Sequence, residues 1–365
     1  MRREFVINSD LLRAFANVAR TVFGYQAEAI AARDAALNPV KLAQAVQRIS
    51  DFYISKPTGK TPYELPGAPA AYLLYYTLLN HVRALAVFRE AKNLGFFEGI
   101  HRVVDWGSGM GAAWLALQDT LPEVLGTSLA FDRSTQALDV QRALRREFAA
   151  ESVTDRHLLT SDEKKFREFM GGDNPDKTLA VFSYSLTELD GLPRWVQDCE
   201  ALAIIEPGTN QDGRRLLAIR EDLIRQGYKV WAPCTHQGSC PLLIHSKTDW
   251  CHDRIQWRQP DFYSALEQHL PMKHRTLVFS YLLARKKLSP PAKLNAAARL
   301  TGDQQNLKGQ TRQMVCRGTE REFLSWQHRH GEPPEFARGE LVKIDSTAQK
   351  KGADIRVIDS QVARV

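Results

Sequence analysis

The stretch HRVVDWGSGMG (residues 101–111), followed at once by AAWLALQDT (112–120), decides the fold. It begins with a short run rich in β-branched residues, passes through a glycine turn and ends in helix-forming residues, so it predicts strand, turn and helix. Glycines let the backbone take positive φ and approach a ligand closely, and the next helix offers unpaired N–H groups. We therefore expect a ligand site at this turn.

Outward from the turn, apolar runs alternate with helical patterns. Strands are predicted over SLAFD (128–132), TLAVFSYS (178–185), ALAIIEPG (201–208), YKVWAPC (228–234) and RTLVFSYLLARK (275–286), and helices over 134–149 and 214–226. Such alternation predicts a parallel sheet covered by helices on both faces. No clear helix joins the last two runs, which makes them candidates for an antiparallel edge pair.

The regions on either side of this α/β pattern differ from it. Helices are predicted from Ser9 to about residue 37, after Asn38-Pro39, and from Ala68 to Lys92, with a loop over 56–69. Residues 289–306 predict loop or weak helix, and short strands follow. We expect three parts: an N-terminal helical region (1–95), an α/β domain (96–288) with a cysteine-containing insertion (233–274), and a basic linker with a β segment that supplies a fourth cysteine (289–365).

Composition narrows the class of protein. Of 365 residues, 44% are hydrophobic and 25% charged, which are globular values and exclude a wholly disordered, collagen-like or coiled-coil chain. The longest nearly apolar run, Tyr72 to Leu79, is far short of the roughly 20 residues that span a bilayer. The start, MRREFVINSD, lacks the apolar core of a secretion signal. We expect a cytoplasmic protein, or a mitochondrial one if the source is eukaryotic, with no membrane partner and with a monomer favoured.

Positive charge is concentrated in one part of the chain. The net charge is +7, from 49 basic and 42 acidic residues. Residues 273–329 hold 12 Lys or Arg against three acids, a net of +9, so the remainder sums to −2. An RNA-contacting surface is one interpretation of this stretch. A solvated basic face or loop is the other.

The turn has the spacing of a nucleotide-binding loop. Asp105, Gly107, Gly109 and Gly111 match the pattern (D/E)xGxGxG of S-adenosylmethionine (SAM) sites, whereas dinucleotide enzymes prefer GxGxxG. Asp132 ends the next predicted strand, where an acid can bind ribose hydroxyls. We favour SAM, with Asp105 near its amino-acid end, the glycines under its backbone and Asp132 at its ribose. A dinucleotide site and an ordinary tight turn remain alternatives.

The residues that would perform methyl transfer are unknown. RNA N-methyltransferases often carry Asn/Asp-Pro-Pro-aromatic after the fourth strand, where this chain has Ser183 to Glu188 (SYSLTE). Tyr184 is a weak candidate for stacking a flipped base, and Glu188 for accepting a proton. A buried tyrosine and a helix-starting acid are equally good interpretations.

Four of the five cysteines fall in suggestive contexts: Cys234 and Cys240 in APCTHQGSCPL, Cys251 in DWCH and Cys316 in QMVCRG. Four thiolates suit tetrahedral zinc or an iron–sulfur cluster. The spacing lacks the CxxC pairs of common zinc ribbons. Nearby alternative ligands are His236, His245 and His252.

Other roles for the cysteines stay open. One is a nucleophile of the cytosine-C5 methyltransferase kind, but that nucleophile follows the fourth or fifth strand, and Cys234 follows the sixth. Another is plain burial of the thiols. Cys199, alone on a predicted helix, is interpreted as packing.

The combination of VVDWGSGMG, FSYSLTEL, IIEPGT, LLAIREDL, WAPCTHQGSCPL, DWCH and Cys316 resembles the methyltransferase-like assembly factors of the mitochondrial small ribosomal subunit and their bacterial relatives. The resemblance extends from about Pro69 to Gly318, and its most specific part is the APC…CPL…DWCH block.

This resemblance implies a class I SAM-methyltransferase-like (Rossmann-like) fold, association with small-subunit ribosomal RNA or a pre-ribosomal particle, and a [4Fe–4S] cluster. By matching motifs, the cluster ligands are Cys234, Cys240, Cys251 and Cys316. The leading hypothesis is a SAM-binding, cluster-containing protein that acts in ribosome assembly. The rivals are an active SAM-dependent rRNA methyltransferase and a zinc-stabilised, non-catalytic RNA-binding module.

Overall fold

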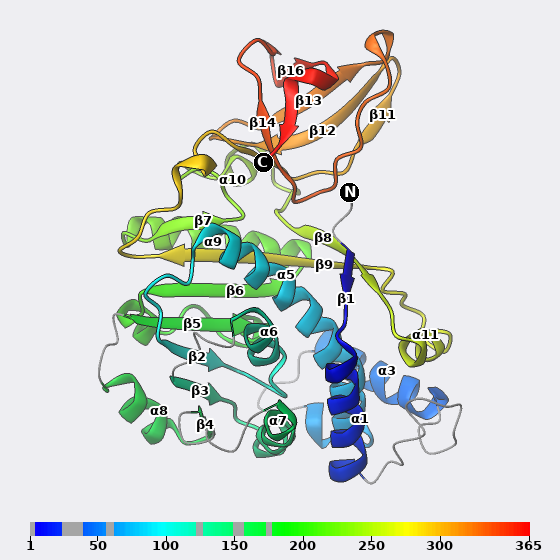
Figure 1. Cartoon of the computed structure of the whole chain (residues 1–365), viewed down its shortest axis with the longest axis vertical. Helices are drawn as coiled ribbons and strands as arrows, with labels where there is room; N and C mark the ends of the chain where they lie inside the picture. The colour runs from blue at the N-terminus through cyan, green and yellow to red at the C-terminus, as the bar shows by residue number, and fades with distance from the viewer. Residues whose placement is uncertain (1–3, 24–38, 56–61, 122–126, 149–156, 173–176) are drawn as a thin grey trace.

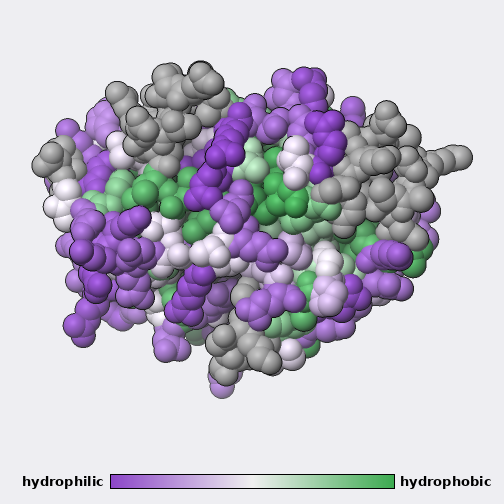
Figure 2. Space-filling model, turned by 90° about the horizontal axis from the view of Figure 1, so that it is seen from below, coloured by the Kyte–Doolittle hydropathy of each residue, from purple (hydrophilic) through white to green (hydrophobic). Residues whose placement is uncertain are grey.

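The computed structural model describes residues 4–23, 39–55, 62–121, 127–148, 157–172 and 177–365. Figure 1 shows a large sheet with helices around it and a second, β-rich part at the end where the chain terminates. Seen from the opposite end, hydrophilic side chains cover most of the visible surface and hydrophobic ones show between them (Figure 2). Within the ranges given above, no helix has the length and apolar character needed to cross a lipid bilayer.

The large sheet has nine strands within the described ranges. They are β1 (Glu4–Val6), β2 (Arg102–Trp106), β3 (Thr127–Phe131), β4 (His157–Thr160), β5 (Thr178–Ser183), β6 (Ala201–Pro207), β7 (Lys229–Ala232), β8 (Asp253–Arg258) and β9 (Thr276–Arg285). Their order is β1-β8-β9-β6-β5-β2-β3-β4, and β7 also pairs with β9. Strands β2 to β6 pair in parallel, whereas β9 is antiparallel to β6, β7 and β8. This is the class I methyltransferase arrangement, so the predicted fold class is confirmed.

Three strands of this sheet are absent from the sequence prediction: β1, β4 and β8. The first two are only three and four residues long, and β8 (DRIQWR) has only two apolar residues, Ile255 and Trp257. Such strands are stabilised by pairing with neighbours rather than by an apolar run of their own. The expected antiparallel pair is found in β7 and β9, but β9 is not at an edge, because it pairs with β6 on its other side.

Helices cover both faces of the sheet. In β5, Leu179 and Val181 belong to one apolar cluster and Ala180 and Phe182 to another, as alternation along a strand requires. The first cluster packs against α1 (Ser9–Phe23), α3 (Pro39–Ser55), α5 (Leu78–Leu94), α6 (Ala112–Thr120) and α7 (Thr135–Phe148). The second packs against α9 (Asn210–Arg225), and α8 (Glu163–Met170) contributes Phe166 to a smaller one.

The predicted helix from Ala68 to Lys92 contains a break in register. It begins as α4 (Ala68–Ala71), widens to a π-helix over Tyr72–Thr77 and continues as α5, which ends at Gly95 with φ 76°, close to the predicted end. Single π turns often occur at functional sites. The first predicted helix is observed as α1 up to Phe23, and its remainder lies outside the described residues.

The C-terminal part forms a sheet of its own. Its strands are β10 (Ala298–Leu300), β11 (Gln305–Leu307), β12 (Gln310–Cys316), β13 (Glu322–Gln327), β14 (Leu341–Ile344), β15 (Gln349–Lys351), β16 (Asp354–Val357) and β17 (Val362–Arg364). They pair in the order β15-β16-β13-β12-β10-β14-β17, with β11 on β12. Leu300, Leu324, Trp326 and Val342 belong to its core. The prediction of loop or weak helix over 289–306 was wrong at β10 and β11, because three-residue strands carry no periodic signal.

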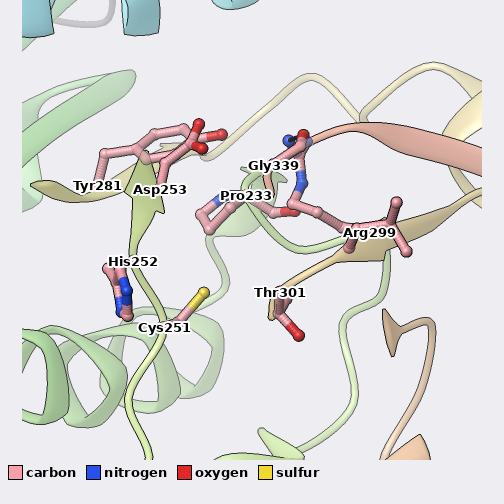
Figure 3. Close-up of a pocket in the computed structure, with 9 residues that line it drawn as sticks. Pro233, Cys251, His252, Asp253, Tyr281, Arg299, Thr301 and Gly339 are labelled. Atoms are coloured by element: carbon pink, nitrogen blue, oxygen red, sulfur yellow. Dashed lines mark hydrogen bonds between the residues drawn. The ribbon is translucent and has the colours of Figure 1, made fainter. Parts of the chain in front are cut away.

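A buried arginine joins the two parts. Arg299 of β10 is 3% exposed, forms an ion pair with Glu90 of α5, and donates to the carbonyls of Pro233 and Gly339. The other oxygen of Glu90 accepts from the Tyr281 hydroxyl of β9 at 2.7 Å. Figure 3 shows Arg299, Pro233 and Gly339 around the same small cavity. The C-terminal part is therefore tied to both α5 and β9.

Replacing Arg299 by Ala should lower the free energy of unfolding by about 3–5 kcal/mol, because Glu90 is left without its cation. Urea denaturation followed by circular dichroism measures the change. Lys343→Ala, at an exposed position of β14, is the matched control and should change stability by less than about 0.5 kcal/mol. Equal midpoints and slopes for the two variants would contradict the role given to Arg299.

Candidate functional site

The glycine turn lies at the carboxyl end of β2. Gly107, Gly109 and Gly111 have φ of 68°, 52° and 89°, in the left-handed region. A Cβ on Gly107 would lie 2.4 Å from the Cβ of Ser185, and one on Gly111 would lie 2.7 Å from Cγ of Gln141. Both conformation and close packing therefore require glycine at these two positions.

Asp132 fastens the turn to the end of β3. Its carboxylate accepts from the Gly109 N–H at 2.8 Å and from the Ser134 N–H at 2.8 Å. Burial raises the pKa of Asp132, and the two N–H bonds oppose that effect. The structure thus brings the predicted ribose-binding acid to the glycine turn, with lone pairs left for a hydroxyl donor.

Asp105 is a buried carboxyl group with no hydrogen-bond partner among the described residues. It is 4% exposed, and both of its oxygens are unpartnered, as are the three guanidinium nitrogens of Arg145. Burial raises the pKa of Asp105 to about 7, with the Arg145 charge opposing it, and burial lowers the pKa of Arg145 to about 9. Buried polar atoms normally have partners. Unused hydrogen-bonding capacity beside a glycine turn fits a polar ligand such as SAM.

Tyrosines of the N-terminal region cover this turn, and the sequence analysis missed them. The Tyr63 hydroxyl lies 3.1 Å from where a Cβ of Gly109 would be, and its ring is 4.8 Å from that of Tyr72. Tyr72 in turn lies 3.4 Å from the Tyr53 hydroxyl. The only signal in the sequence was the density of tyrosines around the π-helix.

The two weak catalytic candidates lie close to this region. Tyr184 has φ 59°, the one positive φ of a non-glycine residue in the described ranges, and its N–H donates to Ile205 O at 2.7 Å. Such strain is typical of functional positions. Burial raises the pKa of Tyr184 to about 12, so its hydroxyl stays protonated. Burial also raises the pKa of Glu188, whose charge acts on Tyr72 and Tyr53.

A second candidate site is a cavity lined by four cysteines. Cys234 follows β7, Cys240 precedes α10 (Pro241–His245), Cys251 precedes β8 and Cys316 ends β12. All four line one cavity together with apolar side chains such as Leu217, Leu242 and Met314. Cys251 and Thr301 also line the neighbouring cavity, which Figure 3 shows. The cavity thus joins the insertion to the C-terminal sheet.

Two residues of α9 organise the loop between Cys234 and Cys240. Arg220 is 1% exposed; its Nε donates to Cys234 Sγ at 3.1 Å and its Nη2 to the carbonyls of His236 and Gly238 at 2.9 and 2.8 Å. Glu221 forms an ion pair with Arg220 and accepts from the Cys240 N–H at 3.0 Å. The arginine of the LLAIREDL motif therefore holds a cysteine loop in place, which spacing alone did not reveal.

The three candidate histidines have different surroundings. His236 lines the cysteine cavity, with Nε2 at 3.5 Å from Cys316 Sγ, and burial lowers its pKa to about 4. His252 lines the neighbouring cavity and stacks on Trp250, whereas His245 is half-exposed near Glu320. Across the described part of the chain, no three His, Cys, Asp or Glu side chains are spaced to hold a single metal ion.

Cys199 is fully buried, away from the other thiols. It packs with Val196 and Leu202 in the apolar cluster on the α9 side of the sheet. It follows a 3₁₀ turn, Arg194–Asp198, and does not lie on a helix, so that detail of the prediction was wrong.

Part of the basic stretch has a structural role. Arg285 and Arg299 are buried against Glu200 and Glu90, and three others form ion pairs: Arg312 with Asp354, Arg317 with Glu322, and Arg321 with Asp249. The exposed cations of the stretch are Lys273, Arg275, Lys287, Lys293, Lys308, Arg317 and Arg329. Charge counted along the sequence therefore overstates the charge available to a partner.

A comparison with known protein families gives a match over most of the chain. Residues 71–339 match the family described as Mitochondrial small ribosomal subunit Rsm22. No curated protein sequence matches the chain.

The similar solved structures are distant. The plantazolicin methyltransferase BpumL is 13% identical, with TM-score 0.35 over 68% of this chain and 98% of that one. TrmK of M. capricolum, solved with S-adenosyl-homocysteine, is 12% identical, with TM-score 0.32 over 55% and 69%. A precorrin-6y methyltransferase of Geobacter metallireducens is 14% identical, with TM-score 0.33 over 54% and 86%.

The pKa of Asp105 predicts how stability depends on pH. Because burial raises this pKa above the ordinary 3.8 to about 7, the folded protein binds the proton more tightly than the unfolded chain. Its contribution is complete below pH 4 and is lost as pH rises through 7. Asp105→Asn should therefore flatten the fall in melting temperature between pH 4 and 7. Asp139→Asn, at an exposed position of α7, is the control and should leave the dependence of melting temperature on pH unchanged. If the melting temperature of Asp105→Asn fell with pH as steeply as that of wild type, the raised pKa of Asp105 would be refuted.

Proposed function

The chain belongs to the family of the mitochondrial small ribosomal subunit protein Rsm22, and from that premise we propose that it is a SAM-binding, methyltransferase-like protein with a [4Fe–4S] cluster that binds small-subunit ribosomal RNA during ribosome assembly. The methyltransferase fold and the ribosomal family membership are the firm part. The cofactors, the ligand residues and the RNA partner are the proposal.

The observation that carries the cluster is that four thiols line one cavity. In a [4Fe–4S] cluster each cysteine binds a different iron, so the thiolates surround a volume, whereas a zinc ion needs four ligands around one point. Apolar neighbours such as Leu217 and Met314 would limit access of water.

The proposed ligands come from two parts of the fold. Cys234, Cys240 and Cys251 belong to the insertion between β7 and β8, and Cys316 belongs to the C-terminal sheet. When bound, a cluster supplies metal–sulfur bonds to both parts and one-electron redox chemistry. Metal binding would thereby contribute to the docking of the C-terminal sheet, because ligand geometry and fold are coupled.

Anaerobically purified wild-type protein should contain about four irons and four acid-labile sulfides per chain. Cys240→Ser should lose most of the iron, because one of four ligands is removed. Cys199→Ser is the matched control and should keep it, since Cys199 is buried elsewhere. Stoichiometric zinc with no sulfide in the wild-type protein would reject the cluster in favour of the zinc alternative.

SAM binding is supported by the geometry of the glycine turn. Gly109 is fixed against Asp132, and the unpartnered carboxyl group of Asp105 lies under the same turn. Asp105, Gly107, Gly109, Gly111 and Asp132 are the proposed contacts. The methyl group of SAM would be directed to the edge of the sheet where Tyr184 lies.

RNA binding is supported by family membership and by the exposed cations of the basic stretch. Lys287, Lys293, Lys308 and Arg329 are exposed around the C-terminal sheet and the linker before it. Phosphate contacts by such side chains are salt-dependent, because binding releases counterions. An active rRNA methyltransferase is the second candidate, favoured by the strained backbone of Tyr184 beside the proposed SAM site.

Filter binding of small-subunit rRNA should give an affinity that falls with salt. Cys240→Ser should weaken binding, because the C-terminal sheet loses its anchor. Gly109→Arg should not, because it obstructs only the turn under Tyr63. Labelled SAM added to the same mixtures tests the second candidate: label on the RNA with wild type and none with Gly109→Arg would establish transfer. Salt-independent binding, or none, would contradict the RNA proposal.

A further inference from the structure

Arg83 is a buried cation on α5, at the face of the sheet that the N-terminal helices cover. It is 8% exposed, and Nη1 donates to the side-chain oxygen of Asn80 at 2.8 Å. Nε has no hydrogen-bond partner, and the guanidinium carbon lies 5.3 Å from the ring centre of Tyr184. Among the described residues, no carboxylate oxygen lies within 4 Å of Arg83.

Three other buried arginines of the chain are matched by glutamates, whereas Arg145 shares with Arg83 the lack of an ion pair. Arg285 lies 3.1 Å from Glu200, Arg299 pairs with Glu90, and Arg220 pairs with Glu221. Burying a cation without such a partner costs several kcal/mol. An unmatched arginine is therefore retained against a stability cost, which points to an anion that binds there.

The buried carboxylate in this neighbourhood is already engaged. Glu267, on α11 (Asp261–Glu267), accepts from the His274 N–H at 2.6 Å and from Gln259 Nε2 at 3.0 Å. One oxygen also lies 3.3 Å from Nδ1 of His274. Glu267 and Arg83 both influence Tyr75 and Tyr263 electrostatically, but no contact joins the two charges. Glu267 thus makes no contact with Arg83, and Glu206, which acts with Arg83 on Tyr184, forms no ion pair with it either. Nε of Arg83 stays without a hydrogen-bond partner.

Arg83 faces the proposed ligand edge of the sheet. Tyr184, under its guanidinium, directly follows β5 and precedes Ser185, whose hydroxyl donates to Trp106 O at 2.6 Å at the start of the glycine turn. Tyr184 is also the residue with strained backbone. In open α/β sheets, ligands bind outside the carboxyl ends of the strands. The unmatched cation, the strained tyrosine and the turn therefore meet at one edge.

We propose that Arg83, oriented by Asn80 and supported by the Tyr184 ring, forms an oxyanion-binding subsite beside the glycine turn. The inference rests on the proposed function, which supplies two sources of an oxyanion: a phosphodiester of bound RNA and the carboxylate of SAM. A guanidinium suits either one, because its N–H groups form a planar fork.

Arg83→Met tests the subsite with three ligands: small-subunit rRNA, SAM, and decarboxylated SAM, which lacks the carboxylate. Affinity for one oxyanion source should fall roughly tenfold or more, the usual size of a lost charge-assisted bond. Arg89→Met, at an exposed position of the same helix, is the control and should match wild type. Arg83→Lys keeps the charge but not the fork, so it should bind with intermediate affinity.

An RNA phosphate and the SAM carboxylate, the two sources of an oxyanion, predict different binding results for Arg83→Met. A phosphate contact predicts weaker RNA binding and a salt slope reduced by about 0.7–0.9, the value for one phosphate, with SAM unaffected. A carboxylate contact predicts weaker SAM binding, while decarboxylated SAM binds wild type and Arg83→Met equally. Wild-type affinity of Arg83→Met for all three ligands would overturn the subsite. Failure of wild type to bind any of them is a failure of the proposed function instead.

Melting temperature separates binding from a structural role. Because the free protein buries Arg83 without an anionic partner, Arg83→Met should melt at the wild-type temperature or above it. If Arg83 instead had only a structural role, Arg83→Met would melt at a lower temperature, and it would lose binding because it is less stable. A decrease of several degrees in Arg83→Met, with Arg83→Lys binding like wild type, would count against the subsite.

Discussion

The rest of the structure depends on how the C-terminal sheet is held against the large sheet. Cys316 ends β12 beside the cavity that Cys234, Cys240 and Cys251 of the insertion also line, so one placement of this sheet brings the four thiols to one cavity. Protein contacts alone define that position, through the Arg299–Glu90 pair and the ion pair of Arg321 with Asp249. Since the ligands are gathered by folding, binding of a metal group would not have to order them, and preorganisation of this kind favours affinity.

The fold was predictable from the sequence where a single segment contains the residue types of its own strand, turn or helix. VVDWGSGMG predicted β2, the turn and α6, because β-branched residues, glycines and helix formers follow one another within a few residues. The position of β9 was not predictable, because an antiparallel strand inserted between β6 and β7 is selected by pairing across the sheet. The π-helix at Tyr72–Thr77 was also missed, since it depends on packing and leaves no local signal.

The candidate site residues also divide into those that the sequence indicates and those that only the fold shows. The cysteines and glycines were found from residue type and spacing, because thiolates and flexible turns have few substitutes in their chemistry. Arg220, Arg83 and Tyr63 were not found as site residues, because an arginine or a tyrosine in a helical or loop pattern is usually on the surface. Only the fold shows that Arg220 bonds to Cys234 and that Tyr63 covers Gly109. For the basic stretch the sequence overstated the site, because several of its arginines form ion pairs within the protein.

The carboxyl edge of the large sheet holds two buried acids with raised pKa values and one buried cation, Arg83. Burial raises the pKa of Asp105 to about 7 and that of Glu206, next to the end of β6, to about 8, so both acids are largely or partly protonated near neutral pH. Arg83 remains a cation at the same edge, and no carboxylate in the described ranges contacts it. An anion near Arg83 would gain from this cation, whereas the charges of Asp132 and Glu188 at the same edge would act on a sulfonium. On the proposal above, Arg83 would therefore serve an oxyanion rather than the sulfonium.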